Sequence, residues 1–339
     1  MVAQGEGAGE LMSGISESDV FIGIEISGRG QRVAVGDQYG TILGQAHAID
    51  SSAPATTVVD TVEGLIDEAC HRAGIDVASV SATGIAFGGP VDADRGLTLL
   101  SHRASGFENF PLVHLIEERF NIPTVIENDA RAAALGESMY GSARGSRDLV
   151  YIHLGTGVGA GIIVDGQFVR GPSGTAGEIG HMVINADGPV CSCGKPGHLE
   201  AYAAGPSIVS RFRQAVRAAG SSDDDQLVEN ERTLTVRSIF NEAERSEGPA
   251  REVVNETVQV LGIAVANLIT VLSPGVVVFG GYVSEAGAVL VDRVSARVRQ
   301  YSYPATARRV RITRSYLGPD ANVIGAVALA VRSHKDGTL

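Results

Sequence analysis

The chain has 339 residues, of which 44% are hydrophobic and 19% are charged. This length suggests two domains of ordinary size, and the composition excludes a largely disordered chain. The 27 Lys and Arg residues against 39 Asp and Glu residues give a net charge of −12, which argues against a nucleic-acid-binding body.

Neither a secretion signal nor a membrane anchor is predicted. Residues 1–18 are polar, acidic and rich in Gly, and they lack the basic start and apolar core of a signal peptide, so we interpret them as a disordered leader. The longest apolar-rich run, Val253–Leu272, contains Asn255, Glu256 and Gln259, which predicts a buried helix rather than a membrane span. Because three cysteines in such a length favour a reducing compartment, we expect a cytoplasmic protein with neither membrane nor nucleic acid as a partner.

The first half of the chain alternates apolar strands with helical patterns. We predict strands at Val20–Ile26, Gln31–Val35, Thr41–Gln45, Ser81–Phe87 and Thr124–Ile126. We predict helices at Val58–Ala73, Leu112–Phe120 and Ala130–Met139. Gly74 would end the first helix, and Cys70 lies on its apolar face and is expected in the core. This alternation predicts an α/β layered domain.

The second half repeats the opening order of strand, Gly-rich turn and strand. We predict strands at Leu149–Leu154, Ile162–Asp165, Val276–Phe279 and Val310–Thr313. We predict helices at Pro206–Ala219, Val236–Glu244, Ala250–Leu272, Ser284–Val298 and Asn322–Ser333. The shared opening suggests duplication of one α/β unit.

Three Gly-rich turns directly follow apolar strands: near Gly28, at Gly155–Gly161, and at Gly280 and Gly281. Glycines let backbone N–H groups approach phosphate oxygens closely. No Gly-Lys-Ser/Thr follows any of the turns, and the turn at Gly155 does not open a helix as a dinucleotide fingerprint requires. The three turns together favour a nucleoside triphosphate.

Asp129 is the candidate catalytic group. It stands between a predicted strand and a predicted helix, with Glu127 and Asn128 beside it. A carboxylate there could take the proton of a substrate hydroxyl that attacks a phosphoryl group. The alternative is that Asp129 is only the N-cap of the helix, and position alone leaves both roles open.

The stretch from Gly177 to Glu200 is rich in Gly and Pro and contains two of the three cysteines. We predict that His181, Cys191, Cys193 and His198 bind a zinc ion, because thiolate and imidazole are its preferred ligands. Four protein ligands leave no open position, so the zinc would be structural and would order the loop. The alternative is two buried thiols with unrelated surface histidines.

Two carboxylates flank the predicted metal loop, Glu178 and Glu200. If His181 binds the metal through one ring nitrogen, the other nitrogen remains available as a donor. The three side chains could then grip the hydroxyls of a polyol. The alternative is that both carboxylates are solvated.

Five motifs match one known family. They are Glu127-Asn128-Asp129-Ala130, Leu154-Gly155-Thr156-Gly157-Val158-Gly159, Glu178-Ile179-Gly180-His181, Cys191-Ser192-Cys193-Gly194 and Gly197-His198-Leu199-Glu200. On these motifs the chain resembles the ROK family (repressors, open reading frames, kinases), whose sugar kinases belong to the actin-like ATPases. The resemblance implies two ribonuclease-H-like α/β domains with an interdomain cleft. Residues 19–129 plus 320–339 would form the N-terminal domain, and 130–319 the C-terminal domain with the zinc loop.

The resemblance also implies the roles of single residues in an ATP-dependent, glucokinase-like sugar kinase, which in this family is commonly a dimer. Asp129 would be the general base. The sugar contacts would come from Gly88, Asn128, Asp129, Glu178, His181 and Glu200. The ATP phosphates would lie on Gly155, Thr156, Gly157 and Gly159, and the nucleoside near Gly280 and Gly281.

Four positions depart from the family's pattern. The first phosphate turn, usually Asp-x-Gly-Gly-Thr, is Glu25-Ile26-Ser27-Gly28-Arg29 here; Glu25 could still hold Mg²⁺ through water, and Arg29 could pair with a phosphate or block it. Arg103 stands where an Asn often contacts sugar hydroxyls, which favours an anionic or unusually oriented group. Arg131 replaces an Asn, and His198 replaces a zinc-binding Cys.

Three functions are compatible with these features. We favour an ATP-dependent kinase acting on a hexose, amino sugar or sugar-like cyclitol. The alternative is a sugar-binding regulatory protein of the same family without a DNA-binding domain, which the altered first turn supports; the leader is too short and polar for a helix-turn-helix domain. A zinc hydrolase is disfavoured because its metal needs an open position.

Overall fold

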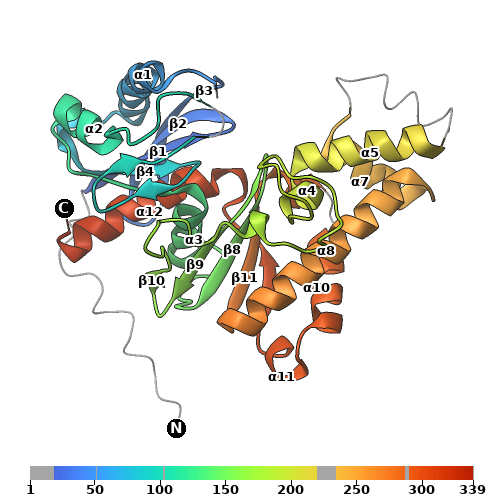
Figure 1. The fold of residues 1–339 in the computed structure, drawn as a ribbon. Coiled ribbons are helices and arrows are strands. Elements are labelled where there is room, and N and C mark those ends of the chain that lie inside the picture. Colours follow the sequence, from blue (N-terminus) through green and yellow to red (C-terminus); the bar gives the residue numbers. More distant parts are fainter. Residues whose placement is uncertain (1–18, 51, 102–103, 220–233, 287–289, 339) are drawn as a thin grey trace, which may run out of the picture. The chain divides into compact units, whose positions relative to one another are not determined.

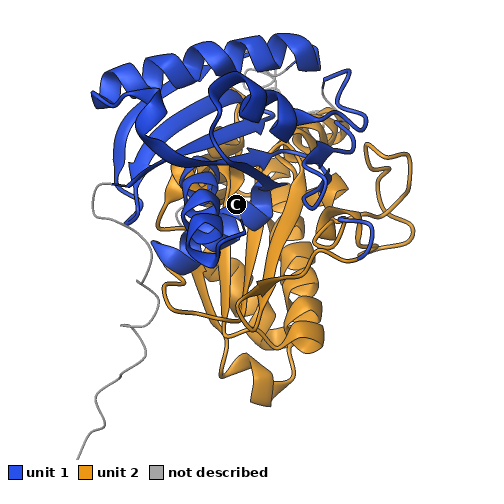
Figure 2. Ribbon diagram, turned by 90° about the vertical axis from the view of Figure 1, so that its left-hand side faces the viewer, with its two compact units in different colours: residues 1–140, 172–174, 322–339 blue, residues 141–171, 175–321 orange. Residues whose placement is uncertain are grey.

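The computed structural model describes residues 19–50, 52–101, 104–219, 234–286 and 290–338. The predicted leader therefore lies outside the described residues. The chain divides into two compact units (Figure 2). Unit 1 comprises the chain up to Tyr140, the short segment Pro172–Gly174 and the chain from Asn322 onward, and unit 2 comprises Gly141–Gly171 and Thr175–Ala321.

Unit 1 is built on a five-stranded sheet in the order β3-β2-β1-β4-β7. The strands are β1 (Val20–Ser27), β2 (Gly30–Asp37), β3 (Ile42–Ala48), β4 (Val80–Phe87) and β7 (Thr124–Asn128). The first three form an antiparallel meander, and β4 and β7 continue the sheet parallel to β1. A small hairpin of β5 (Val91–Asp92) and β6 (Leu97–Thr98) follows β4.

Helices cover both faces of this sheet (Figure 1). They are α1 (Ala55–Ala73), α2 (Leu112–Phe120), α3 (Asp129–Met139) and α12 (Ala321–Asp336), with a 3-10 turn at Val77–Ser79. Strand residues such as Ile22 and Ile24 form one core cluster with α1 and α2, whereas Phe21 and Ala82 pack against α12. Helix α12 lies so close to the sheet that a Cβ at Gly84 would be 2.1 Å from the carbonyl oxygen of Ala326.

Unit 2 repeats the topology. Its sheet has the order β10-β9-β8-β11-β12, with β8, β9 and β10 antiparallel and β11 and β12 parallel to β8. The strands are β8 (Leu149–Leu154), β9 (Val158–Val164), β10 (Gln167–Phe168), β11 (Val276–Gly280) and β12 (Arg311–Arg314). Two sheets with the same strand order and directions agree with duplication of one α/β unit.

The core of unit 2 is formed mainly by its helices against β8, β9 and β11. The helices are α4 (Glu200–Ala203), α5 (Gly205–Ala219), α7 (Val236–Arg245), α8 (Pro249–Leu272), α9 (Tyr282–Ala286), α10 (Leu290–Tyr301) and α11 (Pro304–Ala307), with 3-10 turns at Ile179–His181 and Gly318–Asp320. Helix α8 is long and apolar enough to cross a membrane, but 67% of its most apolar window is buried inside the protein. This confirms the prediction of a buried helix.

The α/β class is confirmed, and most predicted elements agree with the structure to within a few residues. One prediction is wrong: β9 begins at Val158, not at Ile162, because 158–161 pair with β8 instead of extending the turn. The predicted helix Ser284–Val298 falls on α9 and α10, and 287–289 between them lie outside the described residues. Cys70 is 3% exposed, as expected for a core residue, and burial raises the pKa of its thiol to about 11.

Candidate active site and metal centre

The start of helix α3 carries the two polar side chains of the Asn-Asp motif. Asn128 is the N-cap, and its Oδ1 accepts hydrogen bonds from the backbone N–H groups of Ala130 at 3.1 Å and Arg131 at 3.3 Å. The capping role considered for Asp129 therefore belongs to its neighbour. Asp129 is the first helical residue and is half-buried. Its Oδ1 accepts a hydrogen bond from the Ala130 N–H at 2.8 Å. The helix N-terminus stabilises a negative charge at this position.

Gly88 lies between this acid and the first turn. It follows the end of β4, and its N–H donates to the carbonyl oxygen of Ile26 at 2.8 Å. A Cβ on Gly88 would lie 3.2 Å from Cα of Ser27 and 3.4 Å from Oδ2 of Asp129. Gly88, Asp129 and the first turn thus meet where the parallel strands β1, β4 and β7 end. This is the edge at which open α/β sheets bind ligands.

A buried ion pair between Arg131 and Glu127 lies next to this edge of the sheet. Arg131 Nε donates to Glu127 Oε1 at 2.6 Å, and the two side chains are 2% and 0% exposed. The same Glu127 oxygen accepts from the Asn128 N–H at 2.8 Å. A second guanidinium nitrogen of Arg131 donates to the Gly174 carbonyl oxygen at 3.1 Å. Arg131 therefore joins the start of α3 to the 172–174 segment of unit 1.

Removing this arginine should strongly destabilise the protein. In Arg131→Ala the Glu127 carboxylate would remain buried without its counter-ion, which typically costs about 3–5 kcal/mol. Thermal unfolding with calorimetry would measure the loss. The matched control is Arg147→Ala, which breaks the exposed pair with Asp165 and should leave the midpoint nearly unchanged. Equal stabilities of the two variants would contradict the structural role of the buried pair.

The predicted first phosphate turn falls on the end of β1, which contains Glu25, and on the turn between β1 and β2, which consists of Gly28 and Arg29. Glu25 is 1% exposed, its Oε1 accepts from Ser27 Oγ at 2.8 Å and from Asn322 Nδ2 at 3.1 Å, and its Oε2 pairs with Arg32 Nη1 at 3.4 Å. Both oxygens of Glu25 therefore have partners inside the protein, and Glu25 would have to share one of them to hold Mg²⁺ through water. Gly28 is half-exposed and Arg29 is exposed, so both can meet a ligand.

The two remaining Gly-rich turns lie side by side in unit 2. Gly155, Thr156 and Gly157 form the tight turn of the β8–β9 hairpin, in which the Gly155 N–H donates to the Gly157 carbonyl oxygen at 2.9 Å. Gly281 has φ +82°, and a Cβ there would be 2.3 Å from the carbonyl oxygen of Leu154, so only glycine fits beside the hairpin. Gly280 pairs with the β8 residue before Leu154.

Gly159, predicted to belong to the phosphate turn, lies instead within β9 opposite His153. Thr156, at the tip of the hairpin turn, is exposed. The hairpin turn itself therefore consists of 155–157, and Gly159 stands two residues after it in β9, where it is half-buried.

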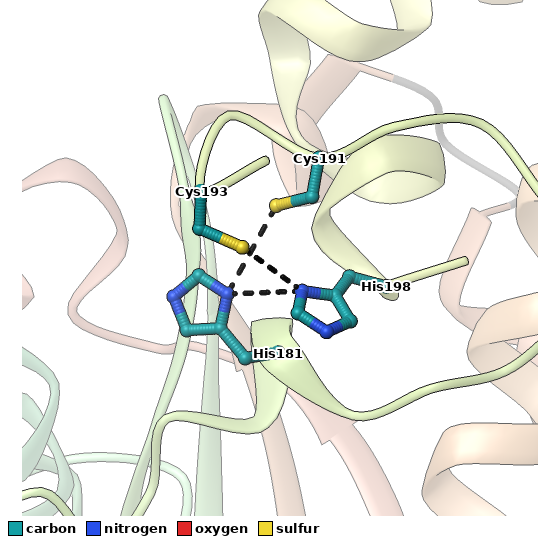
Figure 3. Close-up of side chains that lie close together, drawn as sticks. All are labelled: His181, Cys191, Cys193 and His198. Carbon is teal, nitrogen blue, oxygen red and sulfur yellow. Dashed lines mark hydrogen bonds between the residues drawn. The ribbon is translucent and has the colours of Figure 1, made fainter. Parts of the chain in front are cut away.

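The four predicted metal ligands lie together in unit 2 (Figure 3). His181 ends a short 3-10 turn, Cys191 and Cys193 come from the following loop, and His198 precedes α4. Their candidate ligand atoms all lie within 4.8 Å of one another. The side chains converge on one point, which the alternative of unrelated surface histidines does not explain.

The spacing of these atoms fits tetrahedral zinc. Nδ1 of His181 lies 3.3 Å from Nδ1 of His198, Cys193 Sγ lies 3.3 Å from Nδ1 of His198, and Cys191 Sγ lies 3.9 Å from Nδ1 of His181. Zn–N bonds of about 2.0–2.1 Å and Zn–S bonds of about 2.3 Å place ligand atoms roughly 3.3–3.8 Å apart. Burial raises the pKa of the Cys191 thiol, so metal binding there would release a proton.

Two of the remaining predicted sugar contacts, Glu178 and Glu200, lie near this cluster. Glu178 is exposed and precedes the turn that carries His181. Glu200 is half-buried and opens α4. Arg103 lies outside the described residues. Prediction from the sequence missed Ser192, whose hydroxyl donates to Glu200 Oε1 at 2.8 Å. The position of Ser192 between the two predicted cysteine ligands was the one feature of the sequence that could have pointed to it.

Comparison with known proteins places these features in a family. A model of the ROK family matches residues 21–333. The glucokinase of Halalkalibacterium halodurans is 32% identical over 315 residues, which cover 90% of this chain and 93% of that protein. The xylose repressor of Caldicellulosiruptor bescii is 32% identical over 267 residues, which cover 79% of this chain and 66% of the repressor.

A solved structure shows the same fold with ligands bound. It is a ROK family glucokinase from Streptomyces griseus in complex with glucose and AMPPNP. The likeness has a TM-score of 0.79 at 30% identity, and it covers 92% of this chain and 99% of that one.

Proposed function

The chain belongs to the ROK family, and from this premise we propose that it uses ATP to phosphorylate a hydroxyl group of a hexose, amino sugar or sugar-like cyclitol. The glucokinase relative and the glucose-bound neighbour support the sugar-kinase class. The observation that carries the proposal is the Asp129 carboxylate at the start of α3, beside Asn128 and the open backbone at Gly88.

In the proposed reaction Asp129 accepts the proton of the attacking hydroxyl as that oxygen bonds to the γ-phosphorus of ATP; the bond from this phosphorus to the bridging oxygen breaks, and ADP leaves with that oxygen. Asn128 is also a proposed sugar contact, and its Nδ2 donates to the carbonyl oxygen of Gly89 at 3.2 Å and to Asp129 Oδ1 at 3.3 Å, which fixes the orientation of the proposed base. The other proposed sugar contacts are Gly88, Arg103, Glu178, His181 and Glu200.

The donor would be bound by glycines of unit 2. The backbone at Gly155, Thr156 and Gly157 would receive the phosphates, and Gly280 and Gly281 would lie along the nucleoside. Gly28 and Arg29 would contact the phosphates from the first turn. Since Glu25 is already ion-paired, no step of the proposal depends on a cation held by that side chain.

The test is an ATP-consumption screen of the purified protein against hexoses, amino sugars, acidic sugars and cyclitols. We expect ATP consumption with at least one acceptor and none without an acceptor. The control is the same screen with Asp129→Asn, which removes the proposed base and should lower every positive signal to background. Stoichiometric sugar binding with no ATP consumption for any acceptor would contradict the kinase.

Two observations favour the second candidate, a sugar-binding regulatory protein of the same family. The carboxylate of Glu25 is neutralised within the protein by Arg32, and a xylose repressor is among the relatives. Under this alternative the sugar would bind with unchanged affinity in Asp129→Asn, and ATP would not bind at all.

The structural zinc at His181, Cys191, Cys193 and His198, a homodimer and a cytoplasmic location belong to the same proposal. The spacing of the four ligand atoms supports the zinc. Light scattering coupled to size-exclusion chromatography would test the dimer, and a mass of one 35.1 kDa chain at micromolar concentration would contradict it.

A further inference from the structure

Both ends of the hairpin turn 155–157 are bonded to residues around the short helix α4. The Val158 N–H, immediately after the turn, donates to Glu200 Oε2 at 3.1 Å. The carbonyl oxygen of Gly155, at the start of the turn, accepts from the Gly205 N–H at 2.9 Å. The first residues of α4 and α5 thus hold the turn at two points, and one of the two contacts is made by the charged side chain of Glu200.

The second oxygen of Glu200 is bonded to the metal loop. Glu200 Oε1 accepts from Ser192 Oγ at 2.8 Å, and Cys191 Sγ lies 3.6 Å from the same oxygen. Ser192 stands between Cys191 and Cys193, so its position is fixed by the two proposed metal ligands. One carboxylate therefore bridges the metal loop and the hairpin turn.

We propose that Glu200 is a positioning residue that transmits the order of the metal loop to the turn 155–157, so that phosphate binding by this turn depends on the metal. The proposal rests on the proposed function in one respect, the assignment of the donor phosphates to this turn. Val158 is 4% exposed, and a buried N–H without an acceptor is costly. Without Glu200, or without an ordered loop to hold Glu200, the turn must shift to expose this group to water.

The same carboxylate can serve a sugar at the same time. A carboxylate offers about four acceptor positions, and the Val158 N–H and the Ser192 hydroxyl occupy two of them, because a metal-bound Cys191 thiolate has no proton to donate. A sugar hydroxyl that occupied another position would reduce the freedom of Glu200. Sugar binding would then stiffen the turn and increase its affinity for phosphate groups, a coupling without any change of fold.

The first experiment measures hydrogen exchange in the peptide that contains Val158, by mass spectrometry and without any ligand. In Glu200→Ala we expect this exchange to be roughly tenfold faster than in the unmodified protein, because a buried donor loses its partner. Glu200→Gln, which keeps an acceptor oxygen, should restore most of the protection. The matched control is Asp187→Ala, which removes an exposed carboxylate of the metal loop outside the proposed site and should leave the exchange unchanged. Unchanged exchange in Glu200→Ala would overturn the proposal.

The second experiment connects the turn to the metal. Protein freed of metal by a chelator should show the fast exchange of Glu200→Ala, and addition of zinc alone should restore slow exchange in the unmodified protein but not in Glu200→Ala. Restoration in both proteins would show that Glu200 does not carry the coupling and would overturn the proposal.

The third experiment separates failure of this inference from failure of the proposed function. AMPPNP affinity is measured by calorimetry in the absence of sugar, and we expect it to fall roughly tenfold in Glu200→Ala and to remain unchanged in Asp187→Ala. If the unmodified protein binds no AMPPNP while exchange still depends on Glu200 and zinc, the link between metal and turn stands and the donor assignment is wrong. If AMPPNP binds equally well to both variants, the positioning role is wrong and the donor assignment stands.

Discussion

Replacing Asp129 by Asn is expected to lower turnover of the best acceptor by about 10²–10⁴-fold, the usual contribution of a general base. Asn has the same size and can still accept the hydrogen bond from the Ala130 N–H, so the start of α3 should remain intact. It cannot take a proton from the attacking hydroxyl. Turnover is measured by coupled ATP consumption, and sugar affinity, measured by calorimetry, should change little.

The control for this variant is Asp76→Asn. Asp76 is also an acid at a helix start in unit 1, where its side chain accepts from the Ala78 N–H. It lies outside the proposed site, so its replacement should leave turnover unchanged. Near-normal turnover in Asp129→Asn would refute the assignment of the base, and equal losses in both variants would indicate a general loss of folding.

Removing the metal is expected to have the largest effect on stability. The loop 177–200 contains many Gly and Pro residues and short turns, so the metal supplies much of its order; structural zinc contributes about 10–16 kcal/mol of binding free energy in isolated zinc fingers. We expect about one zinc per chain in the unmodified protein, and its loss, with a much lower unfolding midpoint, in Cys191→Ser. Elemental analysis and thermal unfolding would measure the two effects.

Thiol titration gives an independent readout of the same site. Cys70 is buried and its pKa is raised, so it should not react in the folded protein. Cys191 and Cys193 should be protected by the metal and become reactive after chelation. The control is Cys70→Ala, which should keep the zinc. Well-folded protein without zinc, with Cys193 reactive before any chelator is added, would contradict the site.

The fold could be predicted from the sequence where local patterns coincide with the final contacts. Helix α2 has the predicted bounds Leu112–Phe120, and β8 the predicted bounds Leu149–Leu154. The start of β9 was missed because Gly-Val-Gly-Ala-Gly has the composition of a turn. In the structure Gly159 and Gly161 lie opposite His153 and Tyr151 of β8. Glycine at every second position is compatible with a strand, but whether 158–161 form a strand depends on pairing with β8, which the local sequence does not show.

The candidate site shows a similar limit. The four metal ligands could be predicted because their spacing carries the chemistry. The neutralisation of Glu25 could not be read from a motif, although the register of the β1–β2 hairpin places Arg32 directly opposite it. The contact of Glu25 with Asn322 joins residues 297 positions apart and depends on the tertiary fold alone. The sequence likewise could not show whether Asn128 or Asp129 caps α3, because the cap depends on the backbone conformation at the start of the helix.

The packing of α12 against the first strands has a consequence for synthesis on the ribosome. The helix that covers β1 and β4 is translated after unit 2, and Asn322 at its start completes the partners of Glu25 in the first strand. The strands of unit 1 therefore emerge hundreds of residues before the helix that shields their second face. All of unit 2 is translated in the interval, so it can fold first, while the early strands expose an apolar surface, open to chaperones and to wrong contacts, until α12 emerges.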